Sequence, residues 1–367
     1  MKKHIYLQRP QIGDRAIELV RQVIESKNLV EGKMAEQLEN AIAYYVGAKF
    51  GIACTSATVG LELCLRALEI GKGDEVVIPD FTHPATALAV MTVGAEPIFA
   101  DVDIVTYNVT FATLEEVITN KTTTIIPVSL FGNPLDFEPI WDLAEDNCLW
   151  IIEDAACSLS STYQGNKVGS LADFTVFSFH PRKLLATGDG GMITTDYERH
   201  AEILRSLKHF GVVDGKFEKW GTNARMPEIV AAVGLSQMDS LNKRRLIRFH
   251  KAMFYDELLK DVKGVRTPKI TQGGFSNYQT YAIYIEAGLE KRNYIMDSMR
   301  NDGIEVQIGT HALHMLPVFK NVRRLSSLSN SSLLYNRLLA LPLHEELTDA
   351  DQGYVVDKLK GYLNGKA

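Results

Sequence analysis

The sequence has few cysteines, and their spacing argues against two kinds of site. Four cysteines occur in 367 residues, and no two of them form a C-x-x-C pair. A zinc knuckle needs closely spaced ligand cysteines, and a disulfide framework needs many cysteines in a short secreted chain. Neither is indicated, so we expect a protein of a reducing compartment, the cytoplasm.

Long apolar runs and a strong excess of one charge are also lacking. No apolar run approaches the ~20 residues that a membrane-spanning helix needs. Lys2, Lys3 and His4 interrupt the start of the chain, so we expect no secretion signal. The net charge is -6, and no Lys/Arg cluster alternates with aromatic residues. We therefore expect neither a membrane nor a nucleic acid as partner.

Short apolar runs are present and alternate with helical patterns from residue 50 onward. Such Val/Ile/Leu-rich runs are typical of parallel strands that are covered by helices on both faces. Two helical segments, 13–26 and 34–45, precede them. The expected strands are 50–54, 76–78, 97–100, 125–130, 149–153 and 174–179, and residues 192–195 are also strand-like.

The second half of the chain predicts a smaller unit. A long helical pattern over 227–260 is interpreted as a connector that leaves the sheet. The fold class is therefore α/β, a large domain with a mostly parallel sheet over residues 1–245, followed by a small C-terminal α+β domain over 246–367. The small domain is expected to contain a strand at 281–285, a helix at 292–301, a strand at 304–308 and a terminal helix at 348–363.

Lys183 stands between the apolar run 174–179 and the glycine-rich segment 188–191. A lysine at a strand end among aromatic residues can act as a nucleophile toward a carbonyl group. One interpretation is a lysine that carries pyridoxal phosphate (PLP) as a Schiff base. The other is a surface lysine beside a hairpin, and this segment alone leaves both open.

Two further strand ends carry suitable side chains. Ser56 and Thr58 follow a predicted strand and begin a helix, where backbone N–H groups can bind a phosphate or the hydroxyls can simply cap the helix. Asp154 ends another strand, where an acid can hold a proton on a ring nitrogen or cap the next segment. A phosphate site, a ring partner and an aldehyde partner together fit one cofactor.

At this point the chain resembles the DegT/StrS group of sugar-nucleotide aminotransferases, which are fold type I PLP enzymes that work as homodimers. The resemblance covers nearly the whole chain, and its motifs occur in the family's order. They are Thr-Ser-Ala-Thr at 55–58, Val-Ile-Pro-Asp-Phe-Thr-His at 77–83, the segments 93–97 and 101–103, Phe-Gly-Asn-Pro at 131–134, Glu-Asp-Ala-Ala at 153–156, Ser-Phe-His-Pro-Arg-Lys at 178–183, Gly-Asp-Gly-Gly at 188–191 and Gly-Thr-Asn-Ala-Arg-Met at 221–226.

The resemblance implies a role for each matched residue. Lys183 would form the aldimine with PLP and move the substrate's proton, and Asp154 would pair with the pyridine nitrogen. Asn223 would reach the cofactor phosphate of the neighbouring subunit, so the site would lie at a dimer interface. The phosphate ligands within one chain would be Ser56, Ala57, Thr58 and Ser178.

Two positions depart from the family pattern. His83 stands where an aromatic ring usually stacks on the cofactor; its flat imidazole could do the same, or it could simply pack in its loop. Cys157 stands where many members have a glutamine that contacts the cofactor's 3-hydroxyl. A thiol is a weaker hydrogen-bonding partner, and an inert buried cysteine is the alternative.

The remaining polar candidates are less specific. His311 and His314 could form a metal pair, but no nearby carboxylate or cysteine completes a ligand set, so a loop on the substrate side is preferred and no metal is expected. Arg225 could bind the carboxylate of the amino donor or form a structural salt bridge. Tyr278 and Gln279 are interpreted as core residues.

The resemblance implies amino transfer from L-glutamate, which leaves 2-oxoglutarate, to C-4 of a nucleotide-linked 4-keto-6-deoxy hexose. A C-3 keto sugar or a keto-cyclitol is the alternative acceptor. A non-catalytic PLP-fold regulatory protein is a third reading, which the presence of both Lys183 and Asp154 disfavours. Some relatives have histidine in place of this lysine and dehydrate sugars, and Lys183 argues against that branch.

Overall fold

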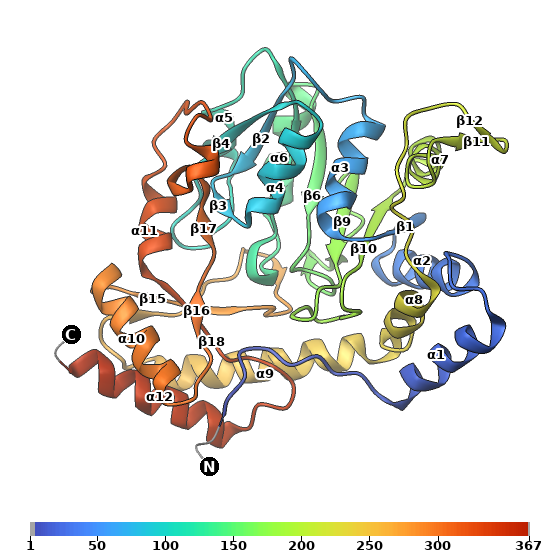
Figure 1. Ribbon diagram of the computed structural model, residues 1–367. Helices are drawn as coiled ribbons and strands as arrows, with labels where there is room; N and C mark the ends of the chain where they lie inside the picture. The colour runs from blue at the N-terminus through green and yellow to red at the C-terminus, as the bar shows by residue number, and fades with distance from the viewer. Residues whose placement is uncertain (1–3, 366–367) are drawn as a thin grey trace.

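The computed structural model describes residues 4–365, and a large sheet of seven strands dominates it (Figure 1). The strand order is β1-β10-β9-β6-β5-β2-β4. The strands from β9 to β4 are parallel, whereas β10 runs antiparallel to both β9 and β1. The expected mostly parallel sheet is therefore confirmed. Its strands are β1 (Phe50–Cys54), β2 (Glu75–Pro79), β4 (Glu96–Ala100), β5 (Thr122–Ile125), β6 (Trp150–Asp154), β9 (Phe174–Ser178) and β10 (Gly191–Thr195).

Helices cover both faces of this sheet, which explains why its strands are apolar on both sides. One core joins Val77 and Ile151 with helices α2, α5, α6 and α8. The other joins Ile78 and Ile152 with α3, α4 and α7. Alternate residues of a strand point to opposite faces, so neighbouring apolar residues enter different cores. The helices are α2 (Lys33–Val46), α3 (Ala57–Ala67), α4 (Pro84–Thr92), α5 (Phe111–Glu115), α6 (Phe137–Asp146), α7 (Glu198–Leu207) and α8 (Glu228–Leu235); α1 (Asp14–Ser26) packs against α8.

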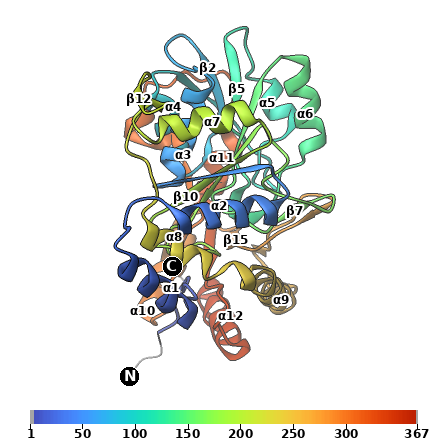
Figure 2. The ribbon, with the colours of Figure 1, turned by 90° about the vertical axis from the view of Figure 1, so that its right-hand side faces the viewer.

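A smaller four-stranded sheet, ordered β13-β15-β18-β16, lies beside the long helix α9 (Leu241–Leu259). This helix runs across the lower part of the molecule in Figure 1 and is seen nearly end-on in Figure 2. A separate core joins α9, α10 and α12 to this sheet. The strands are β13 (Val265–Arg266), β15 (Tyr281–Ile285), β16 (Gln307–Ile308) and β18 (Leu338–Leu341), and the helices are α10 (Leu289–Asn301), α11 (Ser329–Arg337) and α12 (Asp349–Asn364).

Several contacts cross the proposed domain boundary at residue 245. Ile5 forms a parallel bridge with Ile304, and His311 in β17 (His311–Ala312) pairs with Thr82 in β3 (Phe81–Thr82). The strand β14 (Gly274–Phe275) pairs with β7 (Thr162–Tyr163), which also pairs with β8 (Asn166–Lys167). The division into 1–245 and 246–367 stays a proposal, and these contacts hold its two parts together.

Three expected elements differ from the structure. The strand expected at 304–308 is shorter, because β16 comprises only Gln307–Ile308. The strand expected over 125–130 ends at Ile125, because the chain then turns through a 3-10 segment (Leu130–Gly132) in which Phe131 has a φ of 59°. The long helix expected over 227–260 is broken between α8 and α9 by another 3-10 turn (Met238–Ser240). Apolar periodicity continues through both turns, which is why the pattern does not reveal them.

A hairpin of β11 (Val212–Val213) and β12 (Lys216–Phe217) projects from the upper right of the molecule in Figure 1. Phe217 is 79% exposed at this hairpin, and Trp220 follows it at 51%. Within residues 4–365, no helix combines the length and apolar character needed to cross a bilayer.

Candidate active site

A cavity of about 290 Å³ opens where the carboxyl ends of the large-sheet strands face the small domain. Ligands usually bind at this edge of an open α/β sheet. Residues from the N-terminal segment, the large sheet and the small domain all line it. It brings together eight of the residues predicted from the sequence: Ser56, Ala57, Thr58, His83, Asp154, Cys157, Ser178 and Lys183.

Lys183 lies on the loop that follows β9. Its backbone N–H donates to the carbonyl of His180 at 2.8 Å, which closes a tight turn. The next residues, Leu184 and Leu185, are buried and anchor the loop. The Lys183 side chain therefore projects into the cavity from a fixed backbone, and its Nζ donates to Cys157 Sγ at 3.1 Å.

Asp154 ends β6 and lines the same cavity, although only 6% of the residue is exposed. Its Oδ2 accepts a hydrogen bond from Thr86 Oγ1 at 2.8 Å, and its Oδ1 accepts one from the Ala156 backbone N–H at 3.1 Å. These two donors orient the carboxylate. Thr86 was not predicted from the sequence, because it lies in α4, 68 residues away from Asp154.

Glu153 faces away from Asp154 because neighbouring strand residues point to opposite sides of the sheet. It is fully buried, and its carboxylate accepts hydrogen bonds from Ser129 Oγ and Thr175 Oγ1. Burial raises the pKa of Glu153 to about 7, and these hydrogen bonds only partly oppose that effect. Of the two neighbouring acids, Asp154 is the one that can act in the cavity.

The start of α3 forms the other end of the site. Ser56 Oγ accepts a hydrogen bond from the Val59 backbone N–H at 3.3 Å, so the capping role is present. The N–H groups of Ala57 and Thr58 lie in the first turn and have no acceptor one turn earlier. They can donate to an anion, and the helix dipole favours negative charge there. Capping and anion binding are therefore compatible.

Gly191 lets the start of α3 approach the sheet this closely. A Cβ atom at Gly191 would lie 2.6 Å from the Ser56 carbonyl carbon and 2.7 Å from the Ala57 nitrogen. Any larger residue would push the anion-binding turn away from β10. This close contact is a physical reason for a glycine at the end of the segment 188–191, in addition to the family motif in which it lies.

His83 caps α4 and lines the cavity. Its Nδ1 accepts a hydrogen bond from the Ala85 backbone N–H at 3.2 Å. Desolvation lowers the pKa of His83 below its usual 6.5, against the opposing attraction of Asp154. Both observations favour a neutral ring with its proton on Nε2. A neutral imidazole is compatible with stacking on a cofactor, the role that the resemblance implied.

His311 and His314 do not line this cavity. His314 Nδ1 bonds Asp80 Oδ2 at 2.6 Å, and His314 Nε2 lies 3.1 Å from Ser332 Oγ. His311 packs against the ring of Tyr335. Among residues 4–365, no group of three or more His, Cys, Asp or Glu side chains is arranged to hold a metal ion.

Asn223 and Arg225 also lie outside the cavity of their own chain. Asn223 is exposed, and its Oδ1 accepts a hydrogen bond from Arg225 Nε at 3.1 Å. Arg225 further contacts His209 Nε2 at 3.3 Å and lies over the Phe210 ring. In the described part of the chain Arg225 has no carboxylate partner, so the structural salt bridge considered above is not present there.

Gln279, interpreted from the sequence as a core residue, lines the cavity although it is only 3% exposed. Its side chain accepts from the Leu184 backbone N–H at 3.0 Å and donates to the Arg182 carbonyl. It thus fixes the backbone on both sides of Lys183 from the small domain. No local sequence signal distinguishes such a glutamine from an ordinary buried one.

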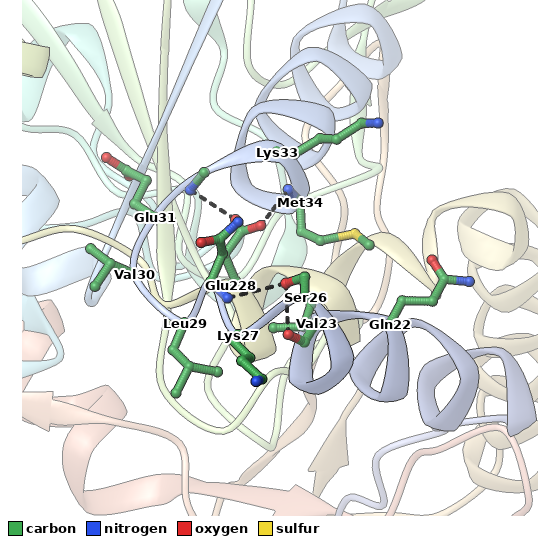
Figure 3. Close-up of a pocket in the computed structure, with 12 residues that line it drawn as sticks. Gln22, Val23, Ser26, Lys27, Leu29, Val30, Glu31, Lys33, Met34 and Glu228 are labelled. Atoms are coloured by element: carbon green, nitrogen blue, oxygen red, sulfur yellow. Dashed lines mark hydrogen bonds between the residues drawn. The ribbon is translucent and has the colours of Figure 1, made fainter.

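A second cavity, of about 420 Å³, lies between the end of α1 and the start of α2 (Figure 3). Glu228 is the buried acid there, but its carboxylate already accepts hydrogen bonds from the N–H groups of Gly32, Met34 and Ala35, each at 2.9 Å. Its role is to hold the loop before α2 in place. This cavity contains no comparable set of free catalytic groups.

The groups in the first cavity fit PLP. An amine, a carboxylate oriented by two donors and a turn with free N–H groups face one space. These are the partners that the aldehyde, the ring nitrogen and the phosphate of PLP require. The 3.1 Å contact between Lys183 and Cys157 shows that the thiol is next to the amine.

Comparison with known proteins agrees with this geometry. The model of the DegT/DnrJ/EryC1/StrS aminotransferase family matches residues 10–360. GDP-perosamine synthase of Caulobacter vibrioides is 35% identical over 334 residues, which cover 89% of this chain and 90% of that protein. UDP-2-acetamido-2-deoxy-3-oxo-D-glucuronate aminotransferase of Pseudomonas aeruginosa is 33% identical over 304 residues, covering 82% and 83%.

A solved structure shows the same fold and the same cofactor. The PLP form of Spr1654 from Streptococcus pneumoniae superposes with a TM-score of 0.93 at 28% identity, covering 98% of this chain and 99% of that one. Together with the match over residues 10–360, this agreement confirms the resemblance of the motifs. The chain therefore belongs to the DegT/DnrJ/EryC1/StrS aminotransferase family and is a PLP-dependent sugar aminotransferase.

Proposed function

We propose that this enzyme transfers the amino group of L-glutamate to C-4 of a nucleotide-linked 4-keto-6-deoxy hexose. The observation that carries the proposal is that Lys183 and Asp154 line one cavity, together with an anion-binding turn. The names of the two curated relatives support the acceptor class, since one contains GDP and the other a UDP-linked oxo sugar.

The cavity wall supports a deoxy sugar. Apolar side chains of Leu7, Val128, Leu130 and Phe131 line it beside the polar groups. An apolar wall favours a methyl group over a hydroxymethyl group, because a buried hydroxyl without a partner is costly. A C-6 methyl would therefore be preferred at this wall.

When bound, PLP supplies the electron sink for the carbon that loses its proton. The protein residues supply the rest. Lys183 Nζ accepts and returns the proton at the reacting carbon, which is general acid–base catalysis. The Asp154 carboxylate, oriented by Thr86, holds the proton on the ring nitrogen. Ala57, Thr58 and Ser178 would hold the phosphate, and His83 would stack on the ring.

A keto group at C-3 is the second candidate for the acceptor. It is favoured by the relative from Pseudomonas aeruginosa, whose name specifies a 3-oxo sugar. The two candidates differ in which carbon is presented to Lys183. Substrate contacts on loops decide that difference, and the catalytic pair would be the same for both.

We also propose that the enzyme works as a homodimer with shared sites. Asn223 is exposed and lies outside its own cavity, which supports a role in the site of a second copy. The nearby Phe217 and Trp220 are large apolar side chains that remain exposed in one chain. Such side chains gain from burial against another subunit.

The test is direct. Purified enzyme is incubated with L-glutamate and a panel of nucleotide-linked 3-keto and 4-keto sugars, and products are identified by mass spectrometry. We expect a gain of one amino group on a 4-keto-6-deoxy sugar and formation of 2-oxoglutarate. Amination of only 3-keto sugars would favour the second candidate, and no amination of any sugar would reject both.

A further inference from the structure

We propose that Arg182 binds the α-carboxylate of the amino donor. This assignment rests on the proposed function, because it assumes that an amino acid is the donor. Arg182 immediately precedes Lys183, and both side chains line the cavity. They are the only Lys or Arg residues among those that line it within the described part of the chain.

The other groups of the cavity that can bind an anion have different uses. Lys183 is taken up by the cofactor and by proton transfer, and the anion-binding turn at the start of α3 serves the cofactor phosphate. His83 and His180 are disfavoured as cations, since desolvation lowers the pKa of both. Arg182 therefore provides a permanent positive charge that the cofactor does not use.

The contacts of Arg182 leave it available for an anion. Its Nη1 donates to Gln307 Oε1 at 2.8 Å, and its carbonyl accepts from Gln279 Nε2. Both partners are neutral amides from the small-domain side. Within residues 4–365, no carboxylate lies within ion-pair distance of Arg182, so its charge is not neutralised internally.

The buried arginine Arg248 shows the contrast. It is paired with Glu345 at 3.1 Å, as expected for a structural ion pair. Arg182 is instead exposed to the cavity and is held in place by Gln307 without losing its charge. A guanidinium prepared in this way can bind a carboxylate through two parallel hydrogen bonds.

The chemistry of the donor selects the α-carboxylate. In an amino acid, the carboxylate is attached to the same carbon as the amine that must reach the position of Lys183. A cation that binds this carboxylate must therefore lie close to Lys183, and Arg182 is the residue directly before it. A keto sugar carries no charge on the carbon that is aminated, so Arg182 should act in the donor half-reaction and not in the sugar half-reaction.

The test separates the two half-reactions in PLP-loaded enzyme. Conversion by L-glutamate is followed by the loss of visible absorbance, and conversion back by the keto sugar is followed by its return. For Arg182→Gln, we expect the glutamate concentration for half-maximal rate to rise by about tenfold to a hundredfold. The response to the keto sugar should stay within about twofold, and Arg182→Lys should recover part of the loss because it keeps the charge.

Binding of maleate, an unreactive dicarboxylate, gives a readout that does not depend on turnover. Calorimetry on PLP-loaded and cofactor-free protein should show that Arg182→Gln binds maleate more weakly than wild type does. The loss should be similar in size to the loss for glutamate. Arg199→Gln is the matched control, since Arg199 is an exposed arginine on α7 outside the cavity. Gln307→Ala keeps the arginine but removes its support, and it should weaken glutamate binding severalfold even if Arg182→Gln does not load PLP.

Three results would overturn the proposal. Unchanged glutamate dependence in both Arg182→Gln and Gln307→Ala would remove Arg182 from donor binding. If Arg182→Gln lowered only the rate of the sugar half-reaction, the guanidinium would instead bind the diphosphate of the nucleotide sugar or an acidic group on the sugar. If no amino acid changes the absorbance of the PLP-loaded wild-type enzyme, the proposed function itself fails. This outcome differs from a wild type that responds normally and a variant that responds in the same way, which would reject only the role of Arg182.

Discussion

Lys183 Nζ donates a hydrogen bond to Cys157 Sγ at 3.1 Å, and both atoms belong to side chains that line the same cavity. The thiol therefore stands directly beside the Lys183 amine. It is reachable through the cavity, in contrast to the buried thiols of Cys54 and Cys64.

This contact predicts a labelling pattern. In cofactor-free enzyme, iodoacetamide should modify Cys157, and PLP should protect it because the cofactor fills the same cavity. Cys148 is exposed and should be labelled in both forms. Cys54 should stay unmodified, since it is fully buried and burial raises its pKa to about 12. Peptide mass spectrometry measures each site, and equal labelling of Cys157 with and without PLP would place the thiol away from the cofactor.

Replacing Lys183 with alanine should remove both cofactor attachment and proton transfer. We expect the rate of amino transfer to fall by about a thousandfold or more. The visible absorbance that marks the bound cofactor should also disappear, whereas circular dichroism should report an unchanged fold. Retained activity would show that another group moves the proton.

Asp154→Asn should lower the rate by about a hundredfold or more, because a neutral amide cannot stabilise a positive charge on the ring nitrogen. Steady-state kinetics with saturating PLP measure the loss. The neighbouring Glu153→Gln is the matched control, since Glu153 lies on the opposite side of the strand and should leave the rate within about twofold. Equal losses in the two variants would indicate a structural effect of the strand instead.

Glu153→Gln should change how stability depends on pH. The folded-state pKa of Glu153 is raised from 4.5 to about 7, so folding favours the protonated carboxyl. Its ionisation therefore destabilises the fold progressively as the pH rises from about 4.5 to about 7, by on the order of 3 kcal/mol. Glutamine cannot ionise. Urea unfolding should show the variant gaining stability relative to wild type over this interval, and a constant difference would contradict the buried titration.

Asn223→Ala tests the shared site. If Asn223 reaches the cofactor phosphate of the partner subunit, the variant should bind PLP about 5- to 30-fold more weakly while remaining a dimer. PLP titration gives the affinity, and analytical ultracentrifugation gives the oligomeric state. Asn120→Ala is the control, because Asn120 is likewise exposed and lies outside the cavity. Unchanged PLP affinity in a dimer would reject the shared-site arrangement.

The sequence predicted the large sheet well because its strands are short, apolar and bounded by turns. It missed β18, whose residues Leu338–Leu341 are fully buried in the small domain, because they follow directly on α11. It also missed the turn at Leu130–Gly132, since an apolar run does not show where a strand ends and a buried turn begins.

The candidate site was predicted unevenly for a related reason. Lys183, Asp154 and the turn at 56–58 stand at strand ends within family motifs, so their order along the chain was informative. Thr86, Gln279 and Gln307 act through contacts with residues 68, 97 and 125 positions away. Nothing in their local sequence marks those partners.

The sequence by itself determined the fold class and the family and predicted which residues would hold the cofactor, because alternation of apolar strands with helices and a fixed order of motifs are properties of the chain alone. Only the tertiary structure decided that Asp154 and not Glu153 faces the cavity and that His314 is bound to Asp80 outside it. It also decided that Arg182, beside Lys183, has no ion-pair partner among residues 4–365. The physical reason is that side-chain direction, burial and hydrogen-bond partners depend on how distant segments pack, and packing is not encoded in local spacing.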